Sequence, residues 1–404
     1  MPNISPLRIL HVASFSGNIG DNANHMGFRP WIERLVDRPV VWTQLEIREF
    51  YWKERMWDDD FVAQVNAHDL AVIGGGNYFE LWVDSSPTGT SIAIDPATFA
   101  RIKTPIFFNA LGVDPGQGAS ETALARFRAF LDTLLASPNH LVSVRNDGAS
   151  ANLARWVGQA YAEAIDTIPD AGFFVAPALA RLLPTPREEG PRPPRFAVNI
   201  ASDMADIRFG QFDDRDGRSA FAAEFAHALE NLAAARPEAE IVMVPHIFRD
   251  LEIISEVIGH LGDRLRRTRL SVAPYGSGNR AALGALRIYE QSDAVLAMRF
   301  HANICPIGLG RQTIGLNCYP QIANLYSELG QPDRALDISR PGFSAALTSV
   351  ALDALDAPDR FLASPAAANA RVFDLREAFE PKISAWLDRH GLAAGRTTSN
   401  PLAR

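Results

Sequence analysis

Two side chains that can hold an anion and move a proton follow an apolar run in the second half of the sequence. The run covers residues 294–298, Arg299 comes next, and His301 follows two residues later. In a parallel α/β sheet, ligands bind at the carboxyl ends of strands. Alternation places Arg299 and His301 on the same side of an extended segment. A fixed cation beside a titratable imidazole suits an anionic substrate that must gain or lose a proton. The alternative is a surface arginine beside a histidine that hydrogen-bonds the backbone, and the spacing alone leaves both open.

A glycine- and asparagine-rich turn follows the first predicted strand, residues 7–14. It contains Asn18, Gly20 and Asp21 and leads into an amphipathic helix. The free N–H groups of a helix N-terminus bind anions or hydroxyls, so we expect a ligand contact here. The turn is not G-x-G-x-x-G, so it does not support a dinucleotide site. Asp21 or Asn22 capping the helix is the alternative, and capping is compatible with ligand contact.

Three glycines end the strand predicted over residues 69–73. Gly74, Gly75 and Gly76 are followed by Asn77. Consecutive glycines allow a sharp turn or the close approach of another group to the backbone. Tight packing alone would need fewer of them, so we expect a ligand-facing loop.

Two more polar side chains stand at strand ends. Arg145 follows the short strand 141–144, and His246 ends the strand that begins at residue 240. Both are expected to contact the substrate. The alternative for Arg145 is an ion pair with Asp147 or Asp166.

Composition and charge limit the class of protein. A chain of 404 residues is too long for one core and fits two domains with extensions. A net charge of −8 and the lack of any basic run argue against a nucleic-acid binder. Lysine occurs only at positions 53, 103 and 382. Arginine therefore carries almost all the positive charge, which favours bidentate contacts to carboxylate or phosphate.

The sequence predicts neither a metal nor a cofactor. Cys305 and Cys318 are too few for a disulfide framework or a metal cluster. The histidines and carboxylates lack the ligand spacing of zinc motifs. The first six residues are not a signal peptide, and no run approaches the length needed to cross a bilayer. We expect a cytoplasmic enzyme.

Strands and helices alternate throughout, which predicts parallel sheets with right-handed crossovers. The proline-rich segment 184–194 is an interdomain linker by composition. We expect an α/β domain over 1–183, a second over 195–345, and a helical extension over 346–404. The strand ends of two such Rossmann-like domains would face each other across a cleft.

Six motifs spread over residues 7–330 occur in an order that matches a known family. They are Asn-Ile-Gly-Asp at 18–21, Ala-Val-Ile-Gly-Gly-Gly at 71–76, Ser-Val-Arg at 143–145 with Asp147 and Ser150, Asp-Ala-Gly-Phe at 170–173, Val-Pro-His at 244–246 with Asp250, and Met-Arg-Phe-His-Ala at 298–302. By these motifs the chain resembles the polysaccharide pyruvyl transferase family. The resemblance implies a fold like that of GT-B glycosyltransferases. It also implies transfer of the pyruvyl group of phosphoenolpyruvate to a sugar as a ketal.

The chemistry that the resemblance implies assigns roles to the candidates. Protonating the enol methylene needs a general acid that ionises near neutrality, for which His301 is the best candidate. Arg299 and Arg145 would hold carboxylate and phosphate, and Asp21 would orient or deprotonate the acceptor hydroxyl. The first domain would be the acceptor side and the second the donor side. The remaining substrate-binding candidates are Asn18, Gly20, Gly74, Gly75, Gly76, Asn77 and His246.

The chain departs from the family at one position. A Tyr-x-x-Lys segment is typical of the family, whereas here Ile322 stands where the lysine would be, three residues after Tyr319. Arg311 or Arg280 is the candidate replacement. Two alternatives therefore stay open: a GT-B-type glycosyltransferase using a sugar nucleotide, or an inactive glycan-binding relative. The expected partners are phosphoenolpyruvate and a sugar of a bacterial surface polysaccharide or its lipid-linked precursor, the latter with peripheral contact to a membrane.

Overall fold

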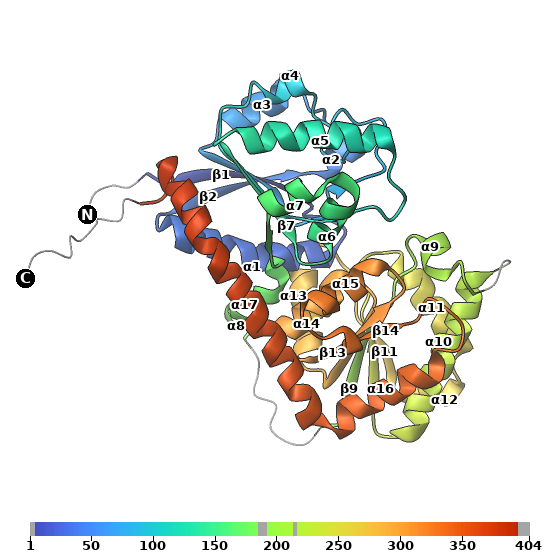
Figure 1. Ribbon diagram of the computed structural model, residues 1–404. Coiled ribbons are helices and arrows are strands. Elements are labelled where there is room, and N and C mark those ends of the chain that lie inside the picture. Colours follow the sequence, from blue (N-terminus) through green and yellow to red (C-terminus); the bar gives the residue numbers. More distant parts are fainter. Residues whose placement is uncertain (1–4, 185–191, 213–215, 395–404) are drawn as a thin grey trace, which may run out of the picture. The chain divides into compact units, whose positions relative to one another are not determined.

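A computed structural model describes residues 5–184, 192–212 and 216–394 (Figure 1). These residues form two compact units. The first contains residues 5–14, 28–169 and 374–394, and the second contains residues 15–27, 170–184, 192–212 and 216–373. Helices α1 (Ile19–Val36) and α17 (Pro358–Arg389) each contribute residues to both units. The domain boundaries expected from composition stay a prediction, and most of the predicted linker lies outside the described residues.

The first unit is built on a six-stranded parallel sheet in the order β2-β1-β3-β5-β7-β8. Strands β3 and β5 are buried at every residue, which explains their unbroken apolar sequences. The strands are β1 (Leu7–Ala13), β2 (Val40–Glu46), β3 (Leu70–Gly74), β5 (Ile106–Leu111), β7 (His140–Arg145) and β8 (Asp166–Ile168), and a separate two-stranded sheet contains β4 (Phe79–Glu80) and β6 (Val113–Asp114).

Helices complete the first unit. Ser120 caps the longest of those that lie wholly within it, α5, by accepting a hydrogen bond from the amide of Ala123, and six residues of α5 are buried against the core. The helices are α2 (Arg48–Tyr51), α3 (Asp59–Asn66), α4 (Pro96–Phe99), α5 (Glu121–Ala136), α6 (Ala149–Asn152), η1 (Leu153–Val157) and α7 (Gln159–Ala164).

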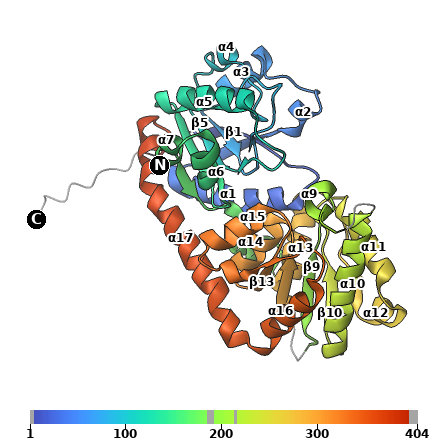
Figure 2. The ribbon, with the colours of Figure 1, turned by 45° about the vertical axis from the view of Figure 1, so that its right-hand side comes forward.

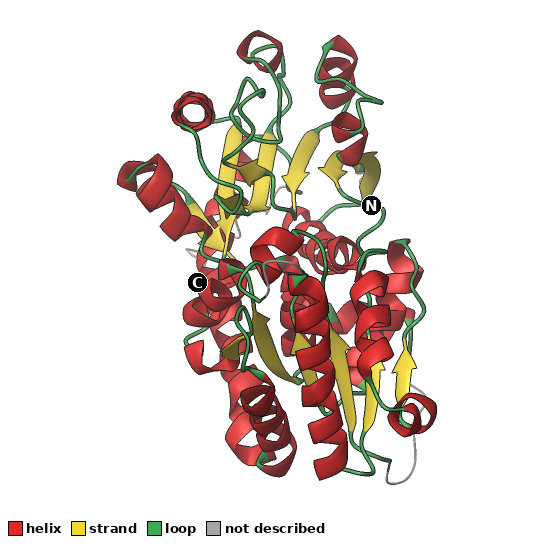
Figure 3. Ribbon diagram, turned by 90° about the vertical axis from the view of Figure 1, so that its right-hand side faces the viewer, coloured by secondary structure: helices red, strands yellow, loops and turns green. Residues whose placement is uncertain are grey.

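The second unit is built on another six-stranded parallel sheet, in the order β11-β10-β9-β12-β13-β14. One apolar core lies on each of its faces. Figure 2 shows α14 and α15 on one side of this sheet and α10 and α16 on the other. Figure 3 shows its strands enclosed by helices. The strands are β9 (Arg195–Asn199), β10 (Glu240–Met243), β11 (Leu270–Val272), β12 (Ala294–Ala297), β13 (Gln312–Asn317) and β14 (Ala335–Asp337).

The helices of the second unit follow the βα order that the sequence predicts. They are η2 (Ala171–Phe174), α8 (Ala176–Leu182), α9 (Ala205–Phe209), α10 (Gly217–Ala235), α11 (Asp250–His260), α12 (Asp263–Thr268), α13 (Gly278–Glu290), α14 (Phe300–Gly308), α15 (Pro320–Glu328), η3 (Pro332–Arg334) and α16 (Ser344–Asp356).

Glycines allow the short helix η2 to pack against the backbones of α1 and α14. A Cβ atom on Gly27 would lie 1.9 Å from the carbonyl oxygen of Ala171, and one on Gly308 would lie 2.1 Å from that of Phe173. Only glycine permits so close an approach of two backbones. The three elements therefore have one closely defined spacing, which fixes the residues at the start of η2 relative to those at the start of α14.

We predict that Gly308→Ala destabilises the protein by about 1–3 kcal/mol, because the added methyl group overlaps a backbone oxygen that cannot rotate away. The control is Gly259→Ala near the end of α11, where a Cβ meets nothing within 4 Å. That change should stabilise by about 0.5–1 kcal/mol through helix propensity. Urea unfolding measures both. Equal stability of the two variants would contradict the predicted packing.

Candidate active site

The turn between β12 and α14 presents Arg299 and His301. The backbone is extended only as far as Arg299, and His301 lies inside the first turn of α14. The expectation that both lie on one extended segment is therefore wrong, because the helix begins at Phe300. Asn303 fixes the turn: its Nδ2 donates to the carbonyl oxygens of Ala297 (2.9 Å) and Arg299 (2.8 Å).

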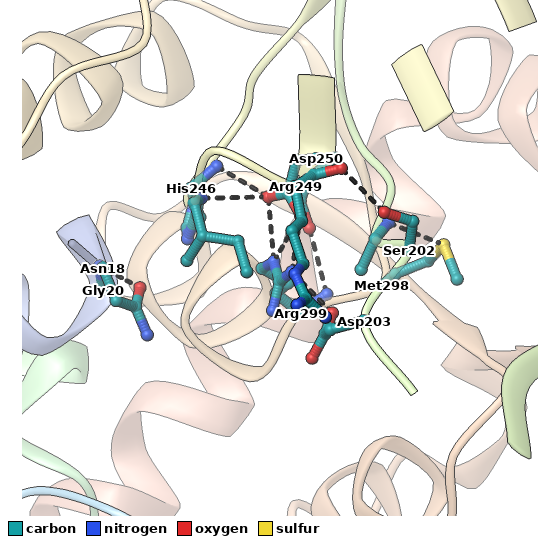
Figure 4. A network of polar contacts seen from close by, with 12 residues as sticks. Asn18, Gly20, Ser202, Asp203, His246, Arg249, Asp250, Met298 and Arg299 are labelled. Atoms are coloured by element: carbon teal, nitrogen blue, oxygen red, sulfur yellow. Dashed lines mark hydrogen bonds and ion pairs between the residues drawn. The ribbon is translucent and has the colours of Figure 1, made fainter. Parts of the chain in front are cut away.

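Arg299 is held by two carboxylates (Figure 4). Its Nε donates to both oxygens of Asp250 at 3.0 and 2.9 Å, and its Nη2 donates to Asp203 Oδ1 at 2.6 Å. Burial by itself lowers the pKa of Arg299, but Asp250 and Asp203 outweigh it and raise that pKa above its ordinary value. The guanidinium is thus permanently charged and rigidly oriented. The side-chain hydrogen bonds from Arg299 to the described residues come from Nε and Nη2. The N–H groups of Nη1 are therefore available to a ligand.

A second guanidinium shares Asp203. Arg208 on α9 donates from Nε to the carbonyl oxygen of Asp203 (2.8 Å) and from Nη1 to Cys318 Sγ (3.1 Å), and its Nη2 lies 3.9 Å from Asp203 Oδ2. Its side chain is 6% exposed, and its Cζ lies 5.7 Å from the centre of the Tyr319 ring. Burial alone would raise the pKa of Asp203, but Arg299 and Arg208 hold it below its ordinary value. The sequence analysis missed Arg208, since it belongs to no recognisable motif.

His301 lies beside a buried carboxylate. Its Nε2 is 3.5 Å from Oδ2 of Asp170, whose side chain has no exposed surface. Asp170 Oδ1 accepts hydrogen bonds from the amide of Gly172 and from Asn24 Nδ2, both at 2.8 Å. Asp170 is thereby fixed at the start of η2. Its place in a family motif was visible in the sequence, but its contact with a histidine 131 positions later was not.

His246 is an internal group. Its Nε2 is 2.6 Å from the hydroxyl of Tyr289, and its backbone amide donates to Asp250 Oδ2 at 2.8 Å. Burial first, and then the nearby charge of Arg299, lowers the pKa of His246 well below its ordinary value, so this imidazole is neutral. His246 is therefore connected to Arg299 through Asp250, which both residues contact. Its contact with substrate stays a prediction.

The N-terminus of α1 lies against His301. Asn18 caps the helix, since its Oδ1 accepts from the amide of Gly20 at 2.9 Å, and its Nδ2 donates to Asp21 Oδ1 at 3.3 Å. The capping residue is therefore Asn18, and not Asp21 or Asn22, which the sequence offered as the alternative to a ligand contact. A Cβ on Gly20 would lie 2.6 Å from Cβ, Cγ and Nδ1 of His301. The second unit therefore brings Asn18, Gly20 and His301 into one group.

In the first unit, the glycine loop packs on the end of β5. A Cβ on Gly74 would lie 2.1 Å from the carbonyl oxygen of Asn109, and the Gly75 amide donates to that oxygen at 3.0 Å with a φ of 81°. Next to it, Ala110 holds a φ of 47° where the pairing of β5 with β7 shifts register. Backbone strain of this kind is concentrated at functional sites. The close approach of Asn109 explains Gly74 and the positive φ explains Gly75, and the ligand-facing role stays a prediction.

Asn77 and Arg145 meet at Gly112. A Cβ on Gly112 would lie 2.2 Å from Asn77 Oδ1 and 2.9 Å from Arg145 Nη2. Arg145 is buried and donates from Nε and Nη2 to Asp147 Oδ2, at 2.9 and 2.7 Å. The ion pair considered as the alternative for Arg145 is therefore present.

A pair of carboxyl groups lies close to Asn77. Glu80 on β4 and Asp114 on β6 are register partners, and Asn77 Nδ2 donates to Asp114 Oδ2 at 2.7 Å. Burial raises the pKa of Glu80 to about 7, the hydrogen bond from Ser91 opposes this, and the charge of Asp114 adds to it. Glu80 thus changes charge near neutral pH, as a general acid or base must.

The position of the missing lysine is filled by packing. Ile322 belongs to the apolar core of the second unit, and a Cβ on Gly315 would lie 2.7 Å from its Cγ2. Arg280 is exposed on α13. The cation beside Tyr319 is Arg208.

We predict that Glu80→Gln changes the pH dependence of stability. The folded-state pKa of Glu80 is about 7, above the unfolded value near 4.3, so the folded state holds its proton while the unfolded state loses it. In the wild-type protein, Glu80 makes its full contribution to the free energy of unfolding below about pH 4.3, and this contribution is lost as the pH rises to 7. The stability of Glu80→Gln relative to wild type should therefore increase by about 3 kcal/mol between pH 4.5 and 7.5.

Urea unfolding at several pH values measures this difference, with Glu54→Gln at an exposed position as the control. A difference between Glu80→Gln and wild type that stays constant over this range would contradict the prediction.

Comparison with solved structures defines the class. The chain is similar to a UDP-N-acetylglucosamine 2-epimerase (TM-score 0.55, 11% identity, covering 98% of this chain and 100% of that one). It is also similar to the UDP-GlcNAc 2-epimerase of Neisseria meningitidis (TM-score 0.52, 9% identity, covering 95% of this chain and 100% of that one). A glycosyltransferase of Rickettsia africae is similar too (TM-score 0.51, 10% identity, covering 95% of this chain and 99% of that one). The fold is that of the GT-B glycosyltransferases and epimerases.

The family follows from the sequence. A sequence model of the polysaccharide pyruvyl transferases matches residues 14–318, which is most of the chain. The chain belongs to the polysaccharide pyruvyl transferase family and is a transferase. The search of curated proteins gave no match. Among the described residues, no helix combines the length and apolarity required for a membrane span.

Proposed function

We propose that this protein transfers the pyruvyl group of phosphoenolpyruvate to two hydroxyls of a sugar, forming a ketal and releasing phosphate. One observation carries the proposal. At the start of α14, His301 faces the buried carboxylate of Asp170, and Arg299 beside it is held by Asp250. The acceptor is a sugar of a bacterial surface polysaccharide or of its lipid-linked precursor, reached from the cytoplasm with peripheral membrane contact.

The reaction needs one proton donor and one anion site. His301 protonates the methylene carbon, which becomes the methyl group and leaves a cationic centre at the neighbouring carbon. The first sugar hydroxyl bonds to that centre and its proton returns to the imidazole. The second sugar hydroxyl then bonds to the same carbon as the bond from that carbon to the phosphate oxygen breaks. The departing phosphate takes the proton of the second hydroxyl. The two hydroxyl protons thus end on the methyl group and on the phosphate.

The anion site is assigned to guanidinium groups. Arg299 offers Nη1 beside His301, and Arg208 supplies a second buried cation 3.9 Å from the shared Asp203. Together they suit a donor that carries both carboxylate and phosphate. Arg145 is a further proposed contact. Asp21, which follows Gly20 on α1, is proposed to orient the acceptor hydroxyl.

We predict that phosphate release requires both phosphoenolpyruvate and a sugar acceptor, tested over galactose, glucose, mannose and N-acetylmannosamine glycosides. His301→Ala should reduce the rate by about 10²–10⁴-fold, because general acid catalysis is lost. The matched control is His260→Ala at an exposed position at the end of α11, which should keep the wild-type rate. Wild-type release no greater than that of His301→Ala would contradict the proposal.

The replacement of the family lysine by the buried Ile322 favours one alternative, a glycosyltransferase that uses a sugar nucleotide. Thermal shifts separate the two, because a ligand that binds only the folded state stabilises it in proportion to the logarithm of its concentration. Stabilisation by phosphoenolpyruvate and not by UDP-GlcNAc supports the pyruvyl transferase. The reverse result supports the alternative.

A further inference from the structure

The two nitrogens of the His301 ring lie in different surroundings. Nε2 is buried, faces Asp170 Oδ2 at 3.5 Å, and makes no hydrogen bond of good geometry within the described residues. Nδ1 lies on the side of Gly20 and is not among the buried ring nitrogens left without a partner. The side chain as a whole is 8% exposed, and Nε2 is the ring nitrogen that is buried without a hydrogen-bond partner.

We propose that Nδ1 of His301 is the atom that gives and takes the proton, and that Asp170 is a positioning residue that holds Nε2–H. This rests on the proposed function, because it specifies how His301 acts in that reaction. The imidazolium form donates its Nδ1 proton to the methylene carbon. Asp170 then keeps the neutral ring that remains in the tautomer with the proton on Nε2, so the lone pair of Nδ1 accepts the hydroxyl proton. When Nδ1 takes the hydroxyl proton, the imidazolium is stabilised by the adjacent carboxylate, which remains ionised.

The position of Asp170 is set by packing and not by chance contact. Both hydrogen bonds to Oδ1 come from groups inside the second unit, Gly172 and Asn24, which leaves Oδ2 directed at the ring. A Cβ on Gly172 would lie 2.9 Å from Cδ1 of Ile304 on α14. The start of η2 therefore cannot move from α14 without opening this packed interface.

The backbone of Gly20 lies against the Nδ1 side of the ring and carries no side chain there. Any side chain at this position would place its Cβ 2.6 Å from Nδ1 of His301. Gly20 needs no positive φ, since it lies in the first turn of α1. Its lack of a side chain is therefore explained by the space that the imidazole occupies.

Other titratable groups surround the ring. Arg299 immediately precedes α14, and Cys305 lies one turn after His301 on that helix. His246 lies within electrostatic range, and Asp21 follows Gly20 on α1. Among the ion pairs of the described residues, the carboxylate that lies within 4.0 Å of a ring nitrogen of His301 is Asp170. Burial, and then the charge of Asp170, raises the pKa of Cys305 well above its ordinary value, so this thiol stays neutral.

Nitrogen NMR of ¹⁵N-histidine-labelled protein tests the tautomer without any substrate. The His301 signals are assigned by their loss in His301→Gln. We predict that the neutral ring carries its proton on Nε2 in the wild-type protein. In Asp170→Asn, the amide can donate to Nε2, so the proton should move to Nδ1. Asparagine still caps η2, which keeps the fold. The matched control is Asp95→Asn, at an aspartate that caps α4 in the first unit.

Kinetics supply the second measurement. Asp170→Asn should lower kcat at least tenfold and change KM for phosphoenolpyruvate less than threefold, whereas Asp95→Asn should change neither. Gly20→Ala should lower kcat with the Nε2–H tautomer retained. A wild-type ring protonated on Nδ1, or an Asp170→Asn protein with the wild-type tautomer and kcat, would overturn the inference. An Nε2–H tautomer in a protein that never consumes phosphoenolpyruvate would instead contradict the proposed function alone.

Discussion

A carboxylate without exposed surface is costly unless hydrogen bonds and a counter-charge compensate it. Asp170 meets this requirement with two hydrogen bonds to one oxygen and a histidine facing the other. These partners of Asp170 come from α1, η2 and α14, so they reach the carboxylate only when the three elements keep one spacing. Glycines at 20, 27, 172 and 308 set that spacing, since each lies where a Cβ would overlap a neighbouring element. The local chemistry of His301 therefore depends on backbone packing.

The arginine network adds a constraint on the ligand. Arg299 and Arg208 together carry two positive charges, and Asp203 and Asp250 carry two negative ones. The group is close to neutral before any ligand binds, so it favours an anion mainly through directed donors and not through net charge. A planar guanidinium with one uncommitted nitrogen suits such directed recognition. A lysine in place of Arg299 would lack the planar fork that holds Asp250 through two nitrogens and also reaches Asp203.

Much of the fold could be predicted because long buried strands leave a clear apolar signal. The strand expected at 7–14 matches β1, and the strands expected at 69–73, 141–144 and 294–298 agree with β3, β7 and β12 within one residue at each end. Four of the five strands of two or three residues, β4, β6, β8 and β14, escaped prediction because they are too short to show a clear periodicity.

The candidate site was only partly readable in the sequence. Arg299 and His301 could be found because both follow an apolar run directly. Asp170 and Arg208 could not be assigned roles, because what matters is their contact with residues about a hundred or more positions away. His246 shows the opposite case. A polar residue at a strand end is a reasonable ligand candidate, but here it is buried against Tyr289.

A crystal structure with phosphoenolpyruvate bound tests the central claim most directly, because it locates the reacting carbon relative to the two ring nitrogens. We predict the methylene carbon within about 3.5 Å of Nδ1 of His301, a distance typical of reacting groups held for attack. The phosphate should contact Nη1 of Arg299 or the guanidinium of Arg208. A donor whose methylene carbon faces another side chain, with His301 out of contact, would contradict the claim.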